Sequence, residues 1–203
     1  MVKKELNTEE RIKEAARKVF MRKGFKGATS REIANEAGLN VALANYYFRK
    51  KEKLFQIVFR ETVGNFLNDI INTLNEPIDL KAKIRSIIEC EYQIQIKNPD
   101  LFTFLYSEIR INAVEYLKEL SGKKDQFLKA WSKQINENIE NNKIRNIDPI
   151  SALTITMSHM HFPIIAASFL KKLGNFNDNA YNKFLFQQKE YAIEMVTKFL
   201  FLE

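Results

Sequence analysis

The residues best suited to chemistry lie within residues 29–51, where polar and cationic side chains stand among small apolar ones. Asn45 can form two hydrogen bonds with an adenine, and Val41 and Ala42 can contact thymine methyl groups. Arg31 can reach a guanine in the same groove. We therefore expect these four side chains to read base edges in the major groove of DNA.

A second set of side chains can bind phosphates without reading sequence. Hydroxyl and ammonium groups donate hydrogen bonds to phosphate oxygens and so fix the position of a protein on the duplex. The set expected to do this comprises Thr29, Ser30, Tyr46, Tyr47 and Lys51.

These side chains need two short helices to position them. Thr29 and Glu32 have capping-box spacing, which predicts a helix that begins at Thr29 and ends at Gly38. Asn40 can cap a further helix that runs to about Phe48. Two short helices joined by a glycine turn are typical of a helix-turn-helix, so DNA binding is the first hypothesis.

Helical spacing predicts which face of the third helix meets DNA. Ala44 and Phe48 are expected to point to the core. The residues expected to point outward are Val41, Ala42, Asn45 and Tyr46.

The distribution of charge supports DNA binding independently. Residues 1–60 hold 15 Lys and Arg against 7 Asp and Glu, a net charge of +8, whereas residues 61–203 hold 17 against 18. Almost all of the basic excess therefore lies in the segment that carries the motif, as expected for a protein that meets phosphates there.

Other classes of protein find little support in the sequence. The single cysteine, Cys90, can form no intrachain disulfide and no zinc finger.

The charged amino terminus lacks an export signal, which predicts a cytoplasmic protein. The uncharged run Ile150–Leu170 is long enough to span a membrane, but it contains His159, His161 and several hydroxyl side chains, so we expect a buried helix and no membrane contact.

The chain is predicted to be all-α, since helix caps and stops recur and no strand pattern is present. A first helix is expected from Asn7 or Thr8 to Gly24, and a fourth from Lys51 to about Asn75. Further helices are expected at 79–97, 99–110, 112–121, 124–142, 149–172 and 178–202. We place an amino-terminal three-helix DNA-binding domain at residues 1–60 and a larger helical domain at 61–203.

The motif resembles the amino-terminal domain of the tetracycline-repressor (TetR) family. The resemblance covers about residues 8–60 and rests on Thr29-Ser30-Arg31-Glu32-Ile33-Ala34, Ala37-Gly38-Leu39, Tyr46-Tyr47-Phe48 and Lys51-Glu52-Lys53-Leu54-Phe55. One difference is Ala44, which stands where the family commonly has Leu.

This resemblance implies a bacterial transcription regulator whose larger domain binds a small molecule and dimerises through its last two helices. Helices 149–172 and 178–202 would then form the dimer interface, with Met195 and Val196 as test positions. The expected partners are a second copy of the chain, a palindromic double-stranded operator and an apolar or aromatic effector. Binding of the effector is expected to release a homodimeric repressor from its operator.

An effector pocket is expected within residues 77–176, because large aromatic side chains and a few polar ones gather there. The residues expected to line it are Tyr92, Phe102, Tyr106, Trp131, His159 and Phe162, and the same run also contains Phe104, Met157 and His161. The two histidines, two residues apart, lie about 200° apart around a helix and cannot chelate one metal from one face. No metal or cofactor is expected.

Alternatives remain at this point. A regulator controlled by a protein partner, or by no ligand at all, would carry the same motif. A helical enzyme is disfavoured because the sequence contains no nucleophile elbow, phosphate loop or His-Glu-x-x-His pair. A protein that coats DNA without sequence preference would also show the basic segment.

Overall fold

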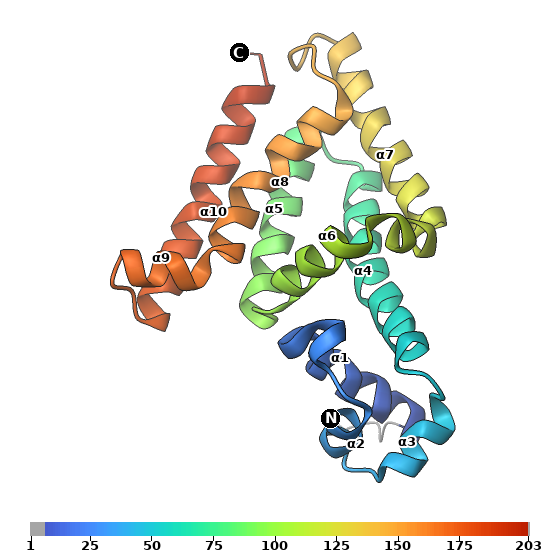
Figure 1. The fold of residues 1–203 in the computed structure, drawn as a ribbon. Helices are drawn as coiled ribbons and strands as arrows, with labels where there is room; N and C mark the ends of the chain where they lie inside the picture. Colours follow the sequence, from blue (N-terminus) through green and yellow to red (C-terminus); the bar gives the residue numbers. More distant parts are fainter. Residues whose placement is uncertain (1–6, 203) are drawn as a thin grey trace, which may run out of the picture. The chain divides into compact units, whose positions relative to one another are not determined.

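The structure is a computed structural model that describes residues 7–202, apart from the side chains of Asn112 and Glu119. Its helices, in chain order, are α1 (Thr8–Gly27), α2 (Ser30–Ala37), α3 (Val41–Tyr47), α4 (Lys51–Asn75), α5 (Leu80–Lys97), α6 (Leu101–Glu119), α7 (Ser121–Glu140), α8 (Pro149–Ile165), α9 (Ala167–Leu173) and α10 (Asp178–Leu200) (Figure 1). The prediction of an all-α chain is confirmed.

The chain divides into two compact units. The amino-terminal unit comprises Met1–Phe66 and Thr103–Ser121, and the carboxyl-terminal unit comprises Leu67–Phe102 and Gly122–Glu203. Most of helix α6 therefore belongs to the same unit as α1–α3, and α4 begins in one unit and ends in the other. The predicted domains at 1–60 and 61–203 stay a prediction.

The core of the amino-terminal unit is an aromatic cluster between α1, α4 and α6. The ring of Phe55 lies 4.9 Å from that of Phe20 and 5.8 Å from that of Phe104. Tyr116 stacks on Phe59 at 4.2 Å. Large aromatic side chains bury much apolar area with few rotatable bonds, so this cluster holds α6 firmly against α4.

Local hydrogen bonds set the angle between α2 and α3. Thr29 and Glu32 form the predicted capping box, and Asn40 Oδ1 accepts a hydrogen bond from Leu43 N at 2.7 Å. Gly38 has φ +66° and ψ +36°, the left-handed conformation that ends α2. Arg11 Nη2 donates to Ala37 O at 2.8 Å and so ties the carboxyl end of α2 to α1.

The carboxyl-terminal unit packs α5 and α8 against α10. Trp131 of α7 is fully buried, and its indole Nε1 donates to Pro149 O at 2.6 Å. Lys83 is also buried, and its ammonium donates to Leu74 O and to Gln134 Oε1. The charged group thus caps the end of α4 and holds it beside α5 and α7.

The structure corrects several predicted boundaries. The helices predicted at 99–110 and 112–121 are one helix, α6, because neither Ile111 nor Asn112 breaks a helix. The helix predicted at 149–172 is instead α8 and α9, which meet at Ala166 with a bend of 66°. Pro163, which has no N–H to donate, lies one turn before this break. The predicted end of the first helix at Gly24 agrees with the structure, since Gly24 has a non-helical φ of +66° and ψ of 176°, and α1 resumes beyond this kink to Gly27.

No single helix within residues 7–202 is both long and apolar enough to cross a membrane, although α8 and α9 together pass that test as a bent pair.

We predict that Gly38→Ala lowers the free energy of unfolding of the amino-terminal unit by about 1–2 kcal/mol, because the left-handed conformation is strained for a residue with a Cβ. A Cβ there would lie 3.5 Å from Arg11 Nη2, an ordinary contact, so the cost is conformational. Gly122→Ala is the control, since no atom lies within 4 Å of its added Cβ. Urea unfolding followed by circular dichroism should show a loss only for Gly38→Ala; equal midpoints would contradict the role of the turn.

Candidate nucleic-acid interface

The outward face of α3 carries the residues predicted to read bases. Ala42 and Asn45 are exposed, Val41 is half-buried, and Tyr46 leaves 78% of its surface accessible. The opposite face is buried through Ala44 and Phe48. The predicted orientation of α3 is therefore confirmed, and the base-reading role of the outward face stays a prediction.

The start of α2 presents two of the predicted side chains to solvent. Arg31 is exposed and Ser30 is half-buried. The hydroxyl of Thr29 instead accepts from Glu32 N at 3.2 Å and donates to Glu32 Oε2 at 2.9 Å. The capping box thus uses the hydroxyl of Thr29, and this limits what it can offer to a phosphate.

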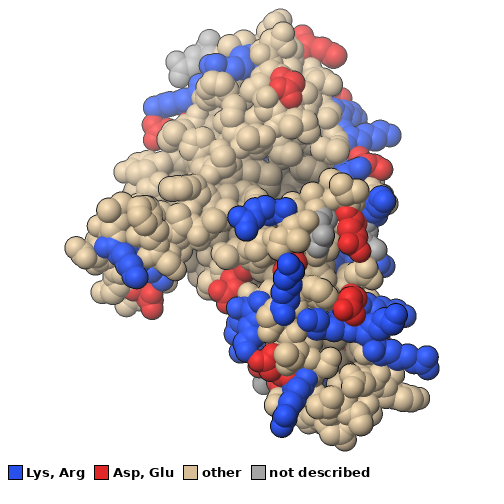
Figure 2. All heavy atoms as spheres, in the orientation of Figure 1, with Lys and Arg blue, Asp and Glu red and all other residues tan. Residues whose placement is uncertain are grey.

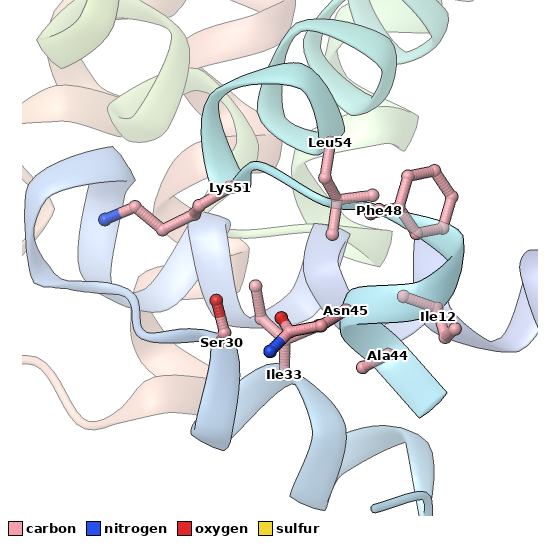
Figure 3. A pocket seen from close by; sticks show the side chains of 8 residues that line it. All are labelled: Ile12, Ser30, Ile33, Ala44, Asn45, Phe48, Lys51 and Leu54. Carbon is pink, nitrogen blue, oxygen red and sulfur yellow. The ribbon is translucent and has the colours of Figure 1, made fainter. Parts of the chain in front are cut away.

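Lys51 is held differently from the free phosphate-binding lysine that was predicted. Its Nζ donates to Phe25 O and Ala28 O, both at 2.9 Å, and lies 4.4 Å above the ring of Phe25. In Figure 3 its amino group points away from Asn45, toward the segment between α1 and α2. Two of its three donors therefore hold backbone carbonyls, which makes Lys51 first a positioning residue.

Other cations are better placed for phosphates. The lysines and arginines of α1 largely pair with acids, such as Lys13 with Glu61 and Arg22 with Glu36. Besides Lys51, the cations of residues 26–53 that form no ion pair with a described residue are Lys26, Arg31, Arg49, Lys50 and Lys53. Blue side chains crowd the lower part of the view in Figure 2, over the amino-terminal helices. The sequence showed this cationic cluster, but the predicted site omitted all but Arg31.

A shallow hollow lies between α2, α3 and α4, beneath the outward face of α3. Ser30, Asn45 and Lys51 border it, and its apolar wall includes Ala44 (Figure 3). A larger side chain at Ala44 would fill part of this space.

A carboxylate of α6 holds the backbone next to this surface. Glu108 is buried, and its Oε1 accepts from Phe25 N at 3.0 Å while its Oε2 accepts from Tyr116 Oη at 3.1 Å. Phe25 follows Gly24, where α1 bends. The two peptide groups of Phe25 are thus held by α6 through the N–H and by α4 through the carbonyl.

The residues predicted to line an effector pocket do not form one group. Trp131 is fully buried with its indole N–H satisfied, whereas Phe162 is 63% exposed. Tyr92 is half-buried against Phe186, at a ring distance of 6.0 Å. His159 Nδ1 lies 3.0 Å from the carbonyl of Ile155, one turn back.

Two further residues of that set also differ in their surroundings. Tyr106 is 38% exposed and belongs to the amino-terminal unit. Phe102 is buried, and its ring centroid lies 5.2 Å from that of His161. Phe102 therefore lies beside a buried polar group, as Tyr92 does beside Lys189.

The predicted site missed two polar residues that are buried beside His161. Glu91 is completely buried, and Gln95 is 6% exposed. Both continue the apolar stripe of Ile84 and Ile88 on one face of α5. That helical spacing was the signal that could have revealed them, since a charged residue on an inward stripe is unusual.

Known proteins resemble both the motif and the fold. Residues 12–58 match the family of bacterial regulatory proteins, tetR family. The "Probable HTH-type transcriptional regulator YttP" of Bacillus subtilis is 29% identical over 111 residues, 53% of this chain and 53% of YttP. The HTH-type transcriptional repressor NicS of Pseudomonas putida is 29% identical over 126 residues, 62% of this chain and 56% of NicS. The matches thus span about half the length of these curated relatives.

A solved structure extends the likeness of fold to nearly the whole chain. The transcriptional regulator FadR from Bacillus subtilis, crystallised in complex with stearoyl-CoA, has a TM-score of 0.69 and covers 93% of this chain and 97% of its own. At 17% identity this likeness shows the fold alone.

The family match falls on α1, α2, α3 and the first turns of α4, the helices that form the surface described above. The relatives are named as transcription regulators, in agreement with the prediction that the chain is not an enzyme. Over residues 12–58 the chain is thus similar to the bacterial regulatory proteins of the tetR family.

Proposed function

We propose that the chain is a cytoplasmic, homodimeric repressor of transcription that binds a palindromic DNA operator and leaves it when a small molecule binds. The observation that carries the proposal is the outward face of α3, where Asn45 and Tyr46 are exposed between unpaired cations. An exposed amide and small apolar groups on a helix suit a major groove, and flanking cations suit phosphates.

Dimerisation would bring two such surfaces onto one duplex. Helix α10 has a stripe of exposed apolar residues at a spacing of four: Tyr191, Met195 and Phe199. Phe162 and Ile165 of α8 are also exposed. Apolar patches of this kind on a monomer are typical of an interface, and pairs of α8 and α10 could form a four-helix bundle with their mates.

The effector is proposed to act through α4 and α6. Helix α4 carries Lys51 at its first residue and continues into the carboxyl-terminal unit, and α6 carries Glu108. A ligand that favours one position of these helices needs a differential affinity equivalent to about 1–3 kcal/mol to change DNA binding. The stearoyl-CoA bound by FadR is consistent with a small-molecule effector for this fold.

Selection of genomic DNA fragments by the purified protein tests the proposal. We expect an enriched palindrome whose half-site centres lie about 34–36 Å apart, or somewhat more, on one side of the duplex. Enrichment of unrelated sequences would instead indicate a protein that coats DNA.

We predict that Asn45→Ala weakens binding to the selected duplex by about 1–3 kcal/mol and leaves binding to random DNA nearly unchanged, because Asn45 reads a base. Lys50→Ala should weaken both equally and lower the salt slope by about one, because Lys50 meets phosphate. Gel-shift titrations at several salt concentrations measure both effects. Equal losses on the two duplexes for Asn45→Ala would rule out base reading.

We predict that Met195→Glu gives monomers, since it places a charge in the proposed apolar interface. Val196, considered from the sequence as a second position, is fully buried within its own subunit and cannot serve. Asn182→Glu is the control, because Asn182 is exposed about half a turn around α10 from Tyr191. Sedimentation should show monomers only for Met195→Glu; a dimer of unchanged strength would place the interface elsewhere.

A further inference from the structure

Glu91 of α5 is buried without the hydrogen bonds that a buried carboxylate requires. It is completely inaccessible to solvent, and neither carboxylate oxygen has a hydrogen-bond partner among residues 7–202. The amide oxygen of Gln95, one turn further along α5, is also buried and without a partner, while its Nε2 donates to Pro99 O at 3.3 Å. Three acceptor atoms are thus enclosed together on one face of α5.

The cluster is bordered by an imidazole and an aromatic ring. His161 Nε2 of α8 lies 3.5 Å from Glu91 Oε2, which is too long for a strong hydrogen bond. The ring centroid of Phe102 lies 5.2 Å from that of His161. The name acceptor cluster is used below for Glu91, Gln95 and His161.

Among residues 7–202, the other buried charged side chains, Glu108, Lys83 and Lys189, have hydrogen-bond partners, which Glu91 lacks. Glu108 accepts two hydrogen bonds, and Lys83 donates two. Lys189 is paired with Glu89 at 2.6 Å and with Glu190 at 2.8 Å. A carboxylate that only stabilised the fold would be expected to have similar donors, because an unsatisfied buried charge costs free energy.

The chemistry of the acceptor cluster selects its partner. Burial raises the pKa of Glu91 above its ordinary value of 4.5, because apolar surroundings disfavour the charged carboxylate, and His161 only partly opposes this. A bound group that supplies hydrogen-bond donors and positive charge would offset the free-energy cost of burying the Glu91 carboxylate. An anion would instead meet three enclosed acceptor atoms and be repelled.

We infer that the acceptor cluster is the polar end of the effector site and binds the cationic nitrogen of an amine or amidine whose apolar part lies against Phe102. Ammonium and amidinium groups have donors and no acceptor, so they match the oxygens of Glu91 and Gln95. This inference rests on the proposed function, in which the carboxyl-terminal unit binds a small-molecule effector. A hydrocarbon body would meet Phe102, and the charged nitrogen would be enclosed at Glu91.

Thermal unfolding of the full-length protein with three series of probes tests the inference. The probes are phenylalkylamines with chains of two to six carbons, together with the alcohols and carboxylates of the same lengths. We expect at least one amine to raise the midpoint in a dose-dependent way and more than its matched alcohol or carboxylate. Glu91→Gln should weaken that amine's binding by about tenfold or more, because a charge-assisted hydrogen bond is lost.

Glu137→Gln is the matched control, since Glu137 is an exposed carboxylate of the same unit. It should bind the amine as the unaltered protein does. Amines no better than alcohols, or equal amine binding by Glu91→Gln, would overturn the inference.

Thermal unfolding without any added probe tests whether Glu91 has a purely structural role. Glu91→Gln removes the buried charge and keeps the shape of the side chain, so its unfolding midpoint should equal or exceed that of the unaltered protein. A clearly lower midpoint would mean that the carboxylate holds the fold together, and it would overturn the inference.

The experiment separates this inference from the proposed function because it uses protein free of DNA. If the selected palindrome is bound but no amine binds, the inference fails and the DNA-binding proposal stands. If the amine binds through Glu91 but a gel shift shows no release of the palindrome, the cation site stands and its role as effector site fails.

Discussion

The reading surface depends on how the backbone from Phe25 to Ala28 is held. Lys51 Nζ binds the carbonyls of Phe25 and Ala28, and Glu108 binds the N–H of Phe25. This segment leads directly into the cap of α2, so its position decides where α2 and α3 stand. Hydrogen bonds to charged groups are roughly twice as strong as those between neutral groups, which makes these three contacts effective clamps on a short segment.

The two side chains that hold this segment, Lys51 and Glu108, come from α4 and α6, the helices through which the effector is proposed to act. Lys51 is the first residue of α4, which ends in the carboxyl-terminal unit, and Glu108 lies within α6. A small movement of either helix would therefore displace carbonyl or amide partners next to α2. In the proposed function, the Phe25–Ala28 segment is where DNA binding would respond, and in the further inference the acceptor cluster on α5 and α8 is where the effector would bind.

Much of this architecture could be predicted from local signals, and the errors have a physical pattern. Capping residues at Thr29 and Asn40, and the turn at Gly38, predicted α2 and α3 well because caps act within a few residues. The role of Lys51 could not be foreseen, since its partner Phe25 is 26 residues away. Glu91 was missed for a related reason: a charge in a helix is usually solvated, and the packing that buries it comes from helices distant in the sequence, since α5 packs against α8 and α10.

The most direct test of the clamp is the affinity of Glu108→Ala for the selected operator duplex, measured beside Glu115→Ala, an exposed carboxylate of the same helix. Removal of the acceptor leaves the N–H of Phe25 without its buried partner, so the account predicts binding weakened by about tenfold for Glu108→Ala and unchanged for Glu115→Ala. Equal affinities for both variants and the unaltered protein would contradict it.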